Sequence, residues 1–103
     1  MYRRSFLALL GLLGACNWLP LTPEGEHVTI ESAQAVTQCE RKGTTTVNTK
    51  SKIGFIPRTA QVVTEELTNL ARNDAARMGA NTIVAETPEQ DGQQTFGLYR
   101  CRR

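Results

Sequence analysis

The stretch TAQVVTEELTNLARNDAARMG, residues 59–79, decides the fold that the sequence predicts. Its apolar residues recur at spacings of three and four, the period of an amphipathic α-helix with one face turned to a core. Thr59 is expected to cap the start, and Gly79 to end the helix in a left-handed conformation. We therefore predict a helix over residues 60–78, with a buried stripe made of Val63, Leu67, Leu70, Ala71, Ala75 and Met78.

Two strand-like segments precede this helix. Residues 27–31 alternate apolar and polar side chains, which is typical of a strand with one buried face. After a turn-like segment at 32–34, residues 36–49 are dense in β-branched side chains and are interrupted by Gly43. This second segment is either one long strand with a bulge or two short strands.

Two more strands are expected after the helix, at 82–87 and 94–101. The segment between them contains Asp91-Gly92, a dipeptide typical of a hairpin turn. The order strand, strand, helix, strand, strand predicts an α+β fold, in which one amphipathic helix packs on one face of a small sheet of three or four strands.

Ahead of this domain, the chain carries the features of a lipoprotein export signal in their usual order. Arg3 and Arg4 supply the positive charge, and residues 6–13 form an apolar run too short to span a bilayer. Residues 13–16, Leu-Gly-Ala-Cys, match the lipobox, in which small residues precede the cysteine that receives lipid. An ordinary secretory peptide or a buried first helix remains an alternative, but neither explains all these features together.

Cleavage before Cys16 divides the chain into a signal peptide at 1–15, a lipidated cysteine with a short membrane tether at 16–26, and a small domain at 27–103. Two prolines in the tether disfavour a helix there. Asn17, rather than Asp, follows the cysteine, which by the sorting rule of enteric bacteria favours the outer membrane. We therefore expect Cys16 to anchor the protein to the lipid bilayer there, with the domain in the periplasm.

Length and charge limit the possible partners of the mature part. The 103 residues leave 88 from Cys16 onward, enough for one small domain. With Arg3 and Arg4 removed, ten basic residues balance ten acidic ones, so no long-range attraction to nucleic acid is expected.

Five short motifs are distinctive: LTPEG at 21–25, Cys39 ahead of Gly43, NLARN at 69–73, MGAN at 78–81 and YRC at 99–101. Together they resemble a family of small proteobacterial lipoproteins of unknown function, over nearly the whole mature chain. The helix followed by Gly-Ala-Asn and a strand is also distantly similar to the outer-membrane stress-sensor lipoprotein RcsF and to YbjQ-like proteins. The sensor, however, has a long tether and two disulfides, whereas this chain has a short tether and cysteines for one.

The remaining cysteines predict a disulfide. Lipidation of Cys16 leaves Cys39 and Cys101, which an oxidising compartment favours as a bonded pair. The strand order brings both to one edge of the sheet, although sequence alone does not fix whether their strands are adjacent. A zinc site that adds His27 to this pair is the less favoured alternative.

Few residues point to catalysis. His27 is the only histidine, and no nucleophile and base pattern accompanies it, so we expect no enzyme, no catalytic residue, no metal and no cofactor. Glu86, Glu89 and Asp91 could bind a divalent cation, but a solvated hairpin tip is the preferred interpretation.

The segment at 50–58 is expected to be a loop, and it is the most apolar loop of the chain. Its apolar residues either fold back as a lid over the core, the preferred interpretation, or form a docking surface for a partner or the nearby membrane. Lys50 and its basic neighbours favour an anionic partner. The candidate contact residues are Lys52, Ile53, Phe55, Ile56 and Arg58.

Three functions follow from these features. The leading one is a non-enzymatic binding protein at the outer membrane with an envelope-protein or cell-wall partner. The alternative is an RcsF-like envelope-stress or redox sensor. A hydrolase of envelope polymers is third, because it lacks candidate catalytic residues.

Overall fold

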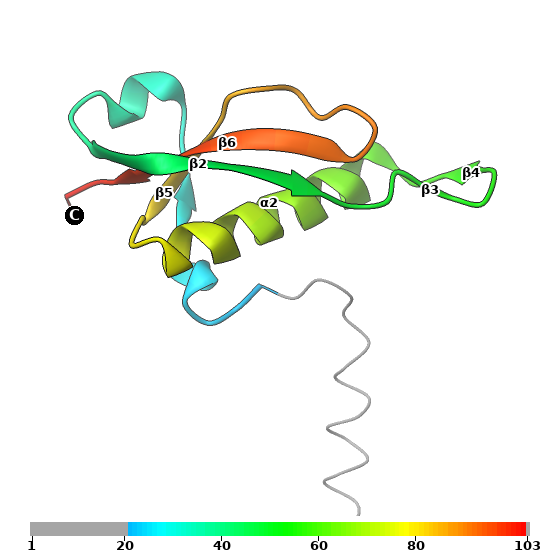
Figure 1. Ribbon diagram of the computed structural model, residues 1–103, viewed down its shortest axis with the longest axis horizontal. Helices are drawn as coiled ribbons and strands as arrows, with labels where there is room; N and C mark the ends of the chain where they lie inside the picture. The colour runs from blue at the N-terminus through cyan, green and yellow to red at the C-terminus, as the bar shows by residue number, and fades with distance from the viewer. Residues whose placement is uncertain (1–20, 103) are drawn as a thin grey trace, which may run out of the picture.

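The computed structural model describes residues 21–102, in which one long helix lies against a four-stranded sheet (Figure 1). The elements in chain order are η2 (Gly25–His27), β1 (Thr29–Ile30), η3 (Ala33–Val36), β2 (Glu40–Asn48), β3 (Lys52–Ile53), β4 (Ile56–Pro57), α2 (Ala60–Arg77), β5 (Thr82–Ala85) and β6 (Gln93–Arg100). The predicted α+β class and the order of the main elements are confirmed. The small hairpin β3–β4 is an addition that the sequence did not predict.

The main sheet has the order β1-β5-β6-β2. The short β1 runs parallel to β5, whereas β5–β6 and β2–β6 are antiparallel pairs. The register of β2 against β6 shifts between Arg41 and Gly43, so the segment is one long strand with a bulge rather than two short strands. β2 therefore forms one edge of the sheet along its full length.

Local signals determine the limits of the helix. The hydroxyl of Thr59 accepts a hydrogen bond from the amide of Val62 (3.3 Å), as expected of an N-cap, and Gly79 has a φ of 77°. The predicted stripe is buried at Val63, Leu67, Ala71 and Ala75, whereas Leu70 is half-buried. Met78 is 44% exposed, so the prediction that it is buried was wrong. The residue lies beyond the last helical turn.

The main core lies between α2 and the sheet. Phe96 and Leu98 alternate along β6 with Gly97, and they pack with the buried stripe of the helix. Val36 and Val84 are also buried but lie outside this cluster. Val84 alternates with the core residue Ile83 along β5 and therefore faces the other side of the sheet.

The start of the second predicted strand was wrong. Residues 33–36 form η3, and a turn carries the chain to Cys39 before β2 begins at Glu40. The β-branched composition suited a strand here, but the burial of Val36 away from the main core favours a helical turn instead.

Residues 21–26, expected to belong to a tether, pack against the domain. The amide and hydroxyl of Thr22 donate hydrogen bonds to Oδ1 of Asn73 (2.9 and 3.0 Å), and Gly25 is buried beside them. Arg72 on the same helix donates to the carbonyl oxygen of Glu26 (3.0 Å). The described chain from Leu21 onward is therefore part of the folded unit, and the predicted signal peptide and Cys16 lie outside the described part of the chain.

Candidate interaction site

The hairpin β3–β4 is built on a two-residue turn. Lys52 pairs with Pro57 and Ile53 with Ile56, which leaves Gly54 and Phe55 at the turn. Gly54 has a φ of 63°, a conformation that glycine adopts without strain at the first position of such turns. The hairpin extends past the N-terminal end of α2 and away from the sheet (Figure 1).

The apolar side chains of this hairpin are in solvent. Phe55 is 101% exposed, Ile56 73% and Ile53 59%. A Cβ atom added at Gly54 would have no heavy atom within 4 Å, which shows how open the surroundings are. The hydrophobic lid was therefore the wrong interpretation, because the hairpin lies beyond the end of the helix, where it has no core to cover. We name Ile53, Gly54, Phe55 and Ile56 the apolar tip.

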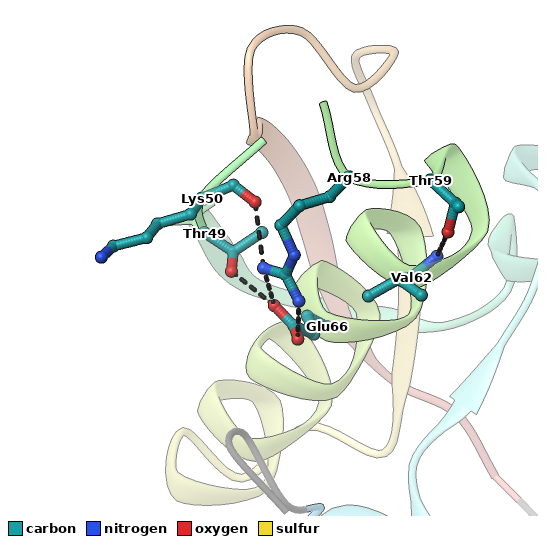
Figure 2. A network of polar contacts seen from close by, with 6 residues as sticks. All are labelled: Thr49, Lys50, Arg58, Thr59, Val62 and Glu66. Atoms are coloured by element: carbon teal, nitrogen blue, oxygen red, sulfur yellow. Dashed lines mark hydrogen bonds and ion pairs between the residues drawn. The ribbon is translucent and has the colours of Figure 1, made fainter. Parts of the chain in front are cut away.

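A polar network holds the base of the hairpin (Figure 2). Nη2 of Arg58 lies 2.5 Å from Oε2 of Glu66, and Nη1 donates to Oε1 of the same carboxylate (2.9 Å) and to the carbonyl oxygen of Lys50 (3.0 Å). The hydroxyl of Thr49 adds a hydrogen bond to Glu66 (2.6 Å). The network therefore joins both arms of the hairpin to α2.

The network also changes the titration of its members. Hydrogen bonds from Arg58 are the largest cause that lowers the pKa of Glu66 below its ordinary value, while the hydrogen bond to Glu66 raises the pKa of Arg58. Both side chains are only 15% exposed. Arg58 was expected to contact a partner, but the structure instead uses its charge inside the network.

Lys50 and Lys52 supply the charge that remains available near the tip. Both residues are exposed, and within residues 21–102 neither ammonium group forms an ion pair. No acidic residue occurs in the sequence between Asn48 and Thr64. The hairpin is thus an apolar tip with a positive flank.

A second polar cluster, which the sequence did not predict, lies on the sheet face that α2 leaves uncovered. Nη1 of Arg41 donates to Oε2 of Glu86 (2.9 Å) and to the hydroxyl of Tyr99 (2.6 Å), and its guanidinium lies 5.3 Å from the centre of the Tyr99 ring. A Cβ at Gly97 would meet Oε2 of Glu86 at 2.4 Å, so this glycine gives the cluster room. The register of β2, β5 and β6 brings these residues together, and no local sequence motif predicts the cluster.

The predicted disulfide joins Cys39 to Cys101, with 4.5 Å between their Cα atoms. Glu40 pairs with Arg100 at the end of the β2–β6 ladder, so one further step places the two cysteines opposite each other. Asn81 fixes the C-terminal partner, because its side-chain amide accepts from the Cys101 amide and donates to its carbonyl, both at 2.8 Å.

Two of the three acidic residues considered for a cation, Glu86 and Glu89, serve other contacts. Glu86 pairs with Arg41, and Glu89 accepts a hydrogen bond from the amide of Gly92 (2.8 Å). In the part of the chain from 21 to 102, no three His, Cys, Asp or Glu side chains are grouped so that they could hold a metal ion. No helix in the same range has both the length and the apolar character needed to cross a membrane.

These features define a class, a small α+β domain with one helix on a mixed sheet, closed by a disulfide at the end of its longest ladder. Within this class the chain belongs to a family described as a domain of unknown function (DUF4156), whose model matches residues 19–101. The expected membership of a family of unknown function is confirmed. Comparison with curated proteins and with solved structures found no match, and nothing in the comparisons supports the distant similarity to RcsF or YbjQ-like proteins.

Proposed function

We propose that the protein is a lipoprotein of the outer membrane, anchored through acylated Cys16, and that it works by binding within the envelope rather than by catalysis. Its contact surface is the apolar tip. The observation that carries this proposal is the exposure of Phe55, Ile53 and Ile56 together on a hairpin whose base is held by the Arg58–Glu66 network. Contiguous exposed apolar groups of this kind are typical of surfaces that another molecule covers.

The sequence ahead of the domain supports the anchor. The positive residues, the apolar run and the lipobox occur in order, and the folded part begins within a few residues of Cys16. An anchor so close to the domain keeps the apolar tip near the membrane surface.

The chemistry of the domain supports binding. Among residues 21–102, the side chains with shifted pKa values are Arg41, Arg58 and Glu66, and each takes part in an ion pair that joins secondary-structure elements. RcsF-like redox sensing would use the Cys39–Cys101 bond, but its position at the end of the β2–β6 ladder favours a structural bond.

Photo-crosslinking in intact cells tests the proposal. A photo-reactive amino acid at position 55 is expected to capture a contact, whereas the same group at Thr44, an exposed site on β2, serves as the control. Adducts from position 55 that do not exceed those from position 44 would overturn the proposed contact surface. Labelled palmitate tests the anchor, because Cys16→Ser is expected to abolish the label and leave uncleaved precursor.

A further inference from the structure

We infer that the occupant of the apolar tip is the lipid bilayer that also holds the Cys16 anchor, with the tip inserted among anionic headgroups. This inference rests on the proposed function, because the lipid anchor supplies the proximity. It gives the domain two attachments to one membrane, a covalent one ahead of Leu21 and a reversible one at β3–β4.

The size of the tip favours a bilayer over a protein partner. A specific protein interface uses roughly 20–30 residues on each side. The tip instead offers three large apolar side chains, Ile53, Phe55 and Ile56, on a narrow hairpin that stands away from the rest of the domain (Figure 1). A fluid hydrocarbon boundary accepts such a projection without a matching pocket.

The charge near the tip indicates the kind of lipid. Lys50 and Lys52 flank the apolar residues and form no ion pair within residues 21–102. Basic residues beside an apolar segment bind the surface of a membrane that contains anionic lipid. The absence of any acidic residue between Asn48 and Thr64 leaves this attraction unopposed by the neighbouring sequence.

The position of the anchor allows both attachments to reach one plane. Five residue steps separate Cys16 from Leu21, which span at most roughly 17 Å when extended. The chain enters beside Asn73 in the C-terminal half of α2, and the hairpin lies beyond the opposite end (Figure 1). Because Ala60 and Asn73 are about 20 Å apart along the helix, the two attachments hold the domain at both ends, so that it lies along the bilayer.

The short tether also explains why a small tip is sufficient. A short linker holds a second binding element at an effective concentration of about millimolar. An inserted state of the tip that would be too weak to form in a free domain is then populated. The two attachments also fix the orientation of the domain. Because the chain enters on the α2 side, beside Asn73, the opposite face of the sheet, which carries Arg41 and Tyr99, turns away from the membrane.

Fluorescence quenching in vesicles tests this inference on the full lipidated protein. Phe55→Cys provides one reactive thiol, because Cys39 and Cys101 are bonded and Cys16 carries lipid. The thiol is labelled with the dye NBD and the protein is reconstituted in vesicles of phosphatidylethanolamine and phosphatidylglycerol that contain a nitroxide lipid. Thr44→Cys, labelled in the same way, is the control on the face expected to turn away.

The expected result is strong quenching at position 55 and little at position 44. Lys50→Gln and Lys52→Gln should each lower the ratio of inserted to withdrawn tip by about fivefold at low salt. An unquenched label at position 55, equal quenching at both positions, or quenching independent of the lysines and of phosphatidylglycerol would overturn the inference. If position 55 crosslinks only to a protein in cells and its label stays unquenched in vesicles, the bilayer is the wrong occupant while the proposed function stands. If Cys16 carries no palmitate, the proposed anchor itself is wrong.

Discussion

Arg58 and Glu66 face each other across the base of β3–β4, with 2.5 Å between Nη2 and Oε2. The pair joins the residue that leaves the hairpin to the second turn of α2, and Thr49 ties the entering arm to the same carboxylate. The orientation of the hairpin is therefore set at its base, because the apolar side chains of the tip are largely exposed.

Removal of this carboxylate is expected to loosen the hairpin. Glu66→Gln abolishes the ion pair and leaves the guanidinium of Arg58 half-buried with weaker hydrogen bonds. Trypsin should then cleave after Lys52 severalfold faster than in the unchanged protein, and the urea midpoint of unfolding should fall slightly. Glu65→Gln is the matched control, since Glu65 is exposed and, within residues 21–102, its carboxylate takes no part in an ion pair and accepts a hydrogen bond from Gln61. Equal cleavage of both variants would show that the network does not hold the hairpin.

The same carboxylate predicts a pH dependence. Arg58 lowers the pKa of Glu66 below the ordinary value of 4.5, so the stabilisation it provides is present above that value and is lost as pH falls through the lower folded pKa. Arg58 stays charged throughout, because the pKa of a guanidinium lies far above this pH range and the pKa of Arg58 is raised further. The difference in unfolding free energy between the unchanged protein and Glu66→Gln should shrink below about pH 4.5. A constant difference from pH 7 to pH 3, measured by urea unfolding, would contradict this assignment.

Two glycines with similar positive φ values separate the cost of a left-handed conformation from the cost of crowding. Gly54 and Gly92 have φ values of 63° and 79°. A Cβ atom added at Gly54 would have no heavy atom within 4 Å, whereas one at Gly92 would lie 2.1 Å from the carbonyl oxygen of Thr49. Gly54→Ala should cost about 1–2 kcal/mol for the left-handed conformation, and Gly92→Ala should cost about 1–3 kcal/mol more because backbone must move. Equal loss of stability in thermal unfolding would refute the crowding at Gly92.

The Cys39–Cys101 disulfide is expected to contribute a large part of the free energy of unfolding of the domain. It closes a loop with a sequence separation of 62 residues. In the chain-entropy model such a loop contributes roughly 4 kcal/mol, a large share for a small domain. The double variant Cys39→Ala/Cys101→Ala should lower the unfolding free energy by about this amount, and reduction of the unchanged protein should have the same effect. A loss below about 1 kcal/mol, outside the usual range for such bonds, would show that the β2–β6 ladder is sufficient to hold this end.

The sequence predicted the parts of the fold that local signals determine. The cap at Thr59, the stripe through Leu67 and the glycine at 79 agree with one another within a single helix, so its limits were accurate to one residue. The pairing of Cys39 with Cys101 followed from counting cysteines, although only the strand register shows that they are opposite each other.

The remaining features depend on contacts between distant residues. Thr22 docks on Asn73, 51 positions later, so residues 21–26 looked like a tether in the sequence. The direction of the apolar tip depends on where α2 begins relative to the sheet, and composition alone does not contain that information. The Arg41–Glu86 pair likewise joins residues 45 positions apart.

Phe55 and Phe96 are a matched pair that tests the role of the tip. Phe55 is 101% exposed, and its loss should change the free energy of unfolding by less than about 0.5 kcal/mol. Phe96 is 2% exposed in the core between α2 and the sheet, and Phe96→Ala should cost about 3–5 kcal/mol. With a photo-reactive group at position 53, Phe55→Ala should capture clearly less of its contact than the unchanged tip, because the largest apolar side chain is gone. A stability loss for Phe55→Ala close to that of Phe96→Ala, with capture intact, would mean that Phe55 packs within the domain and that the tip is not a contact surface.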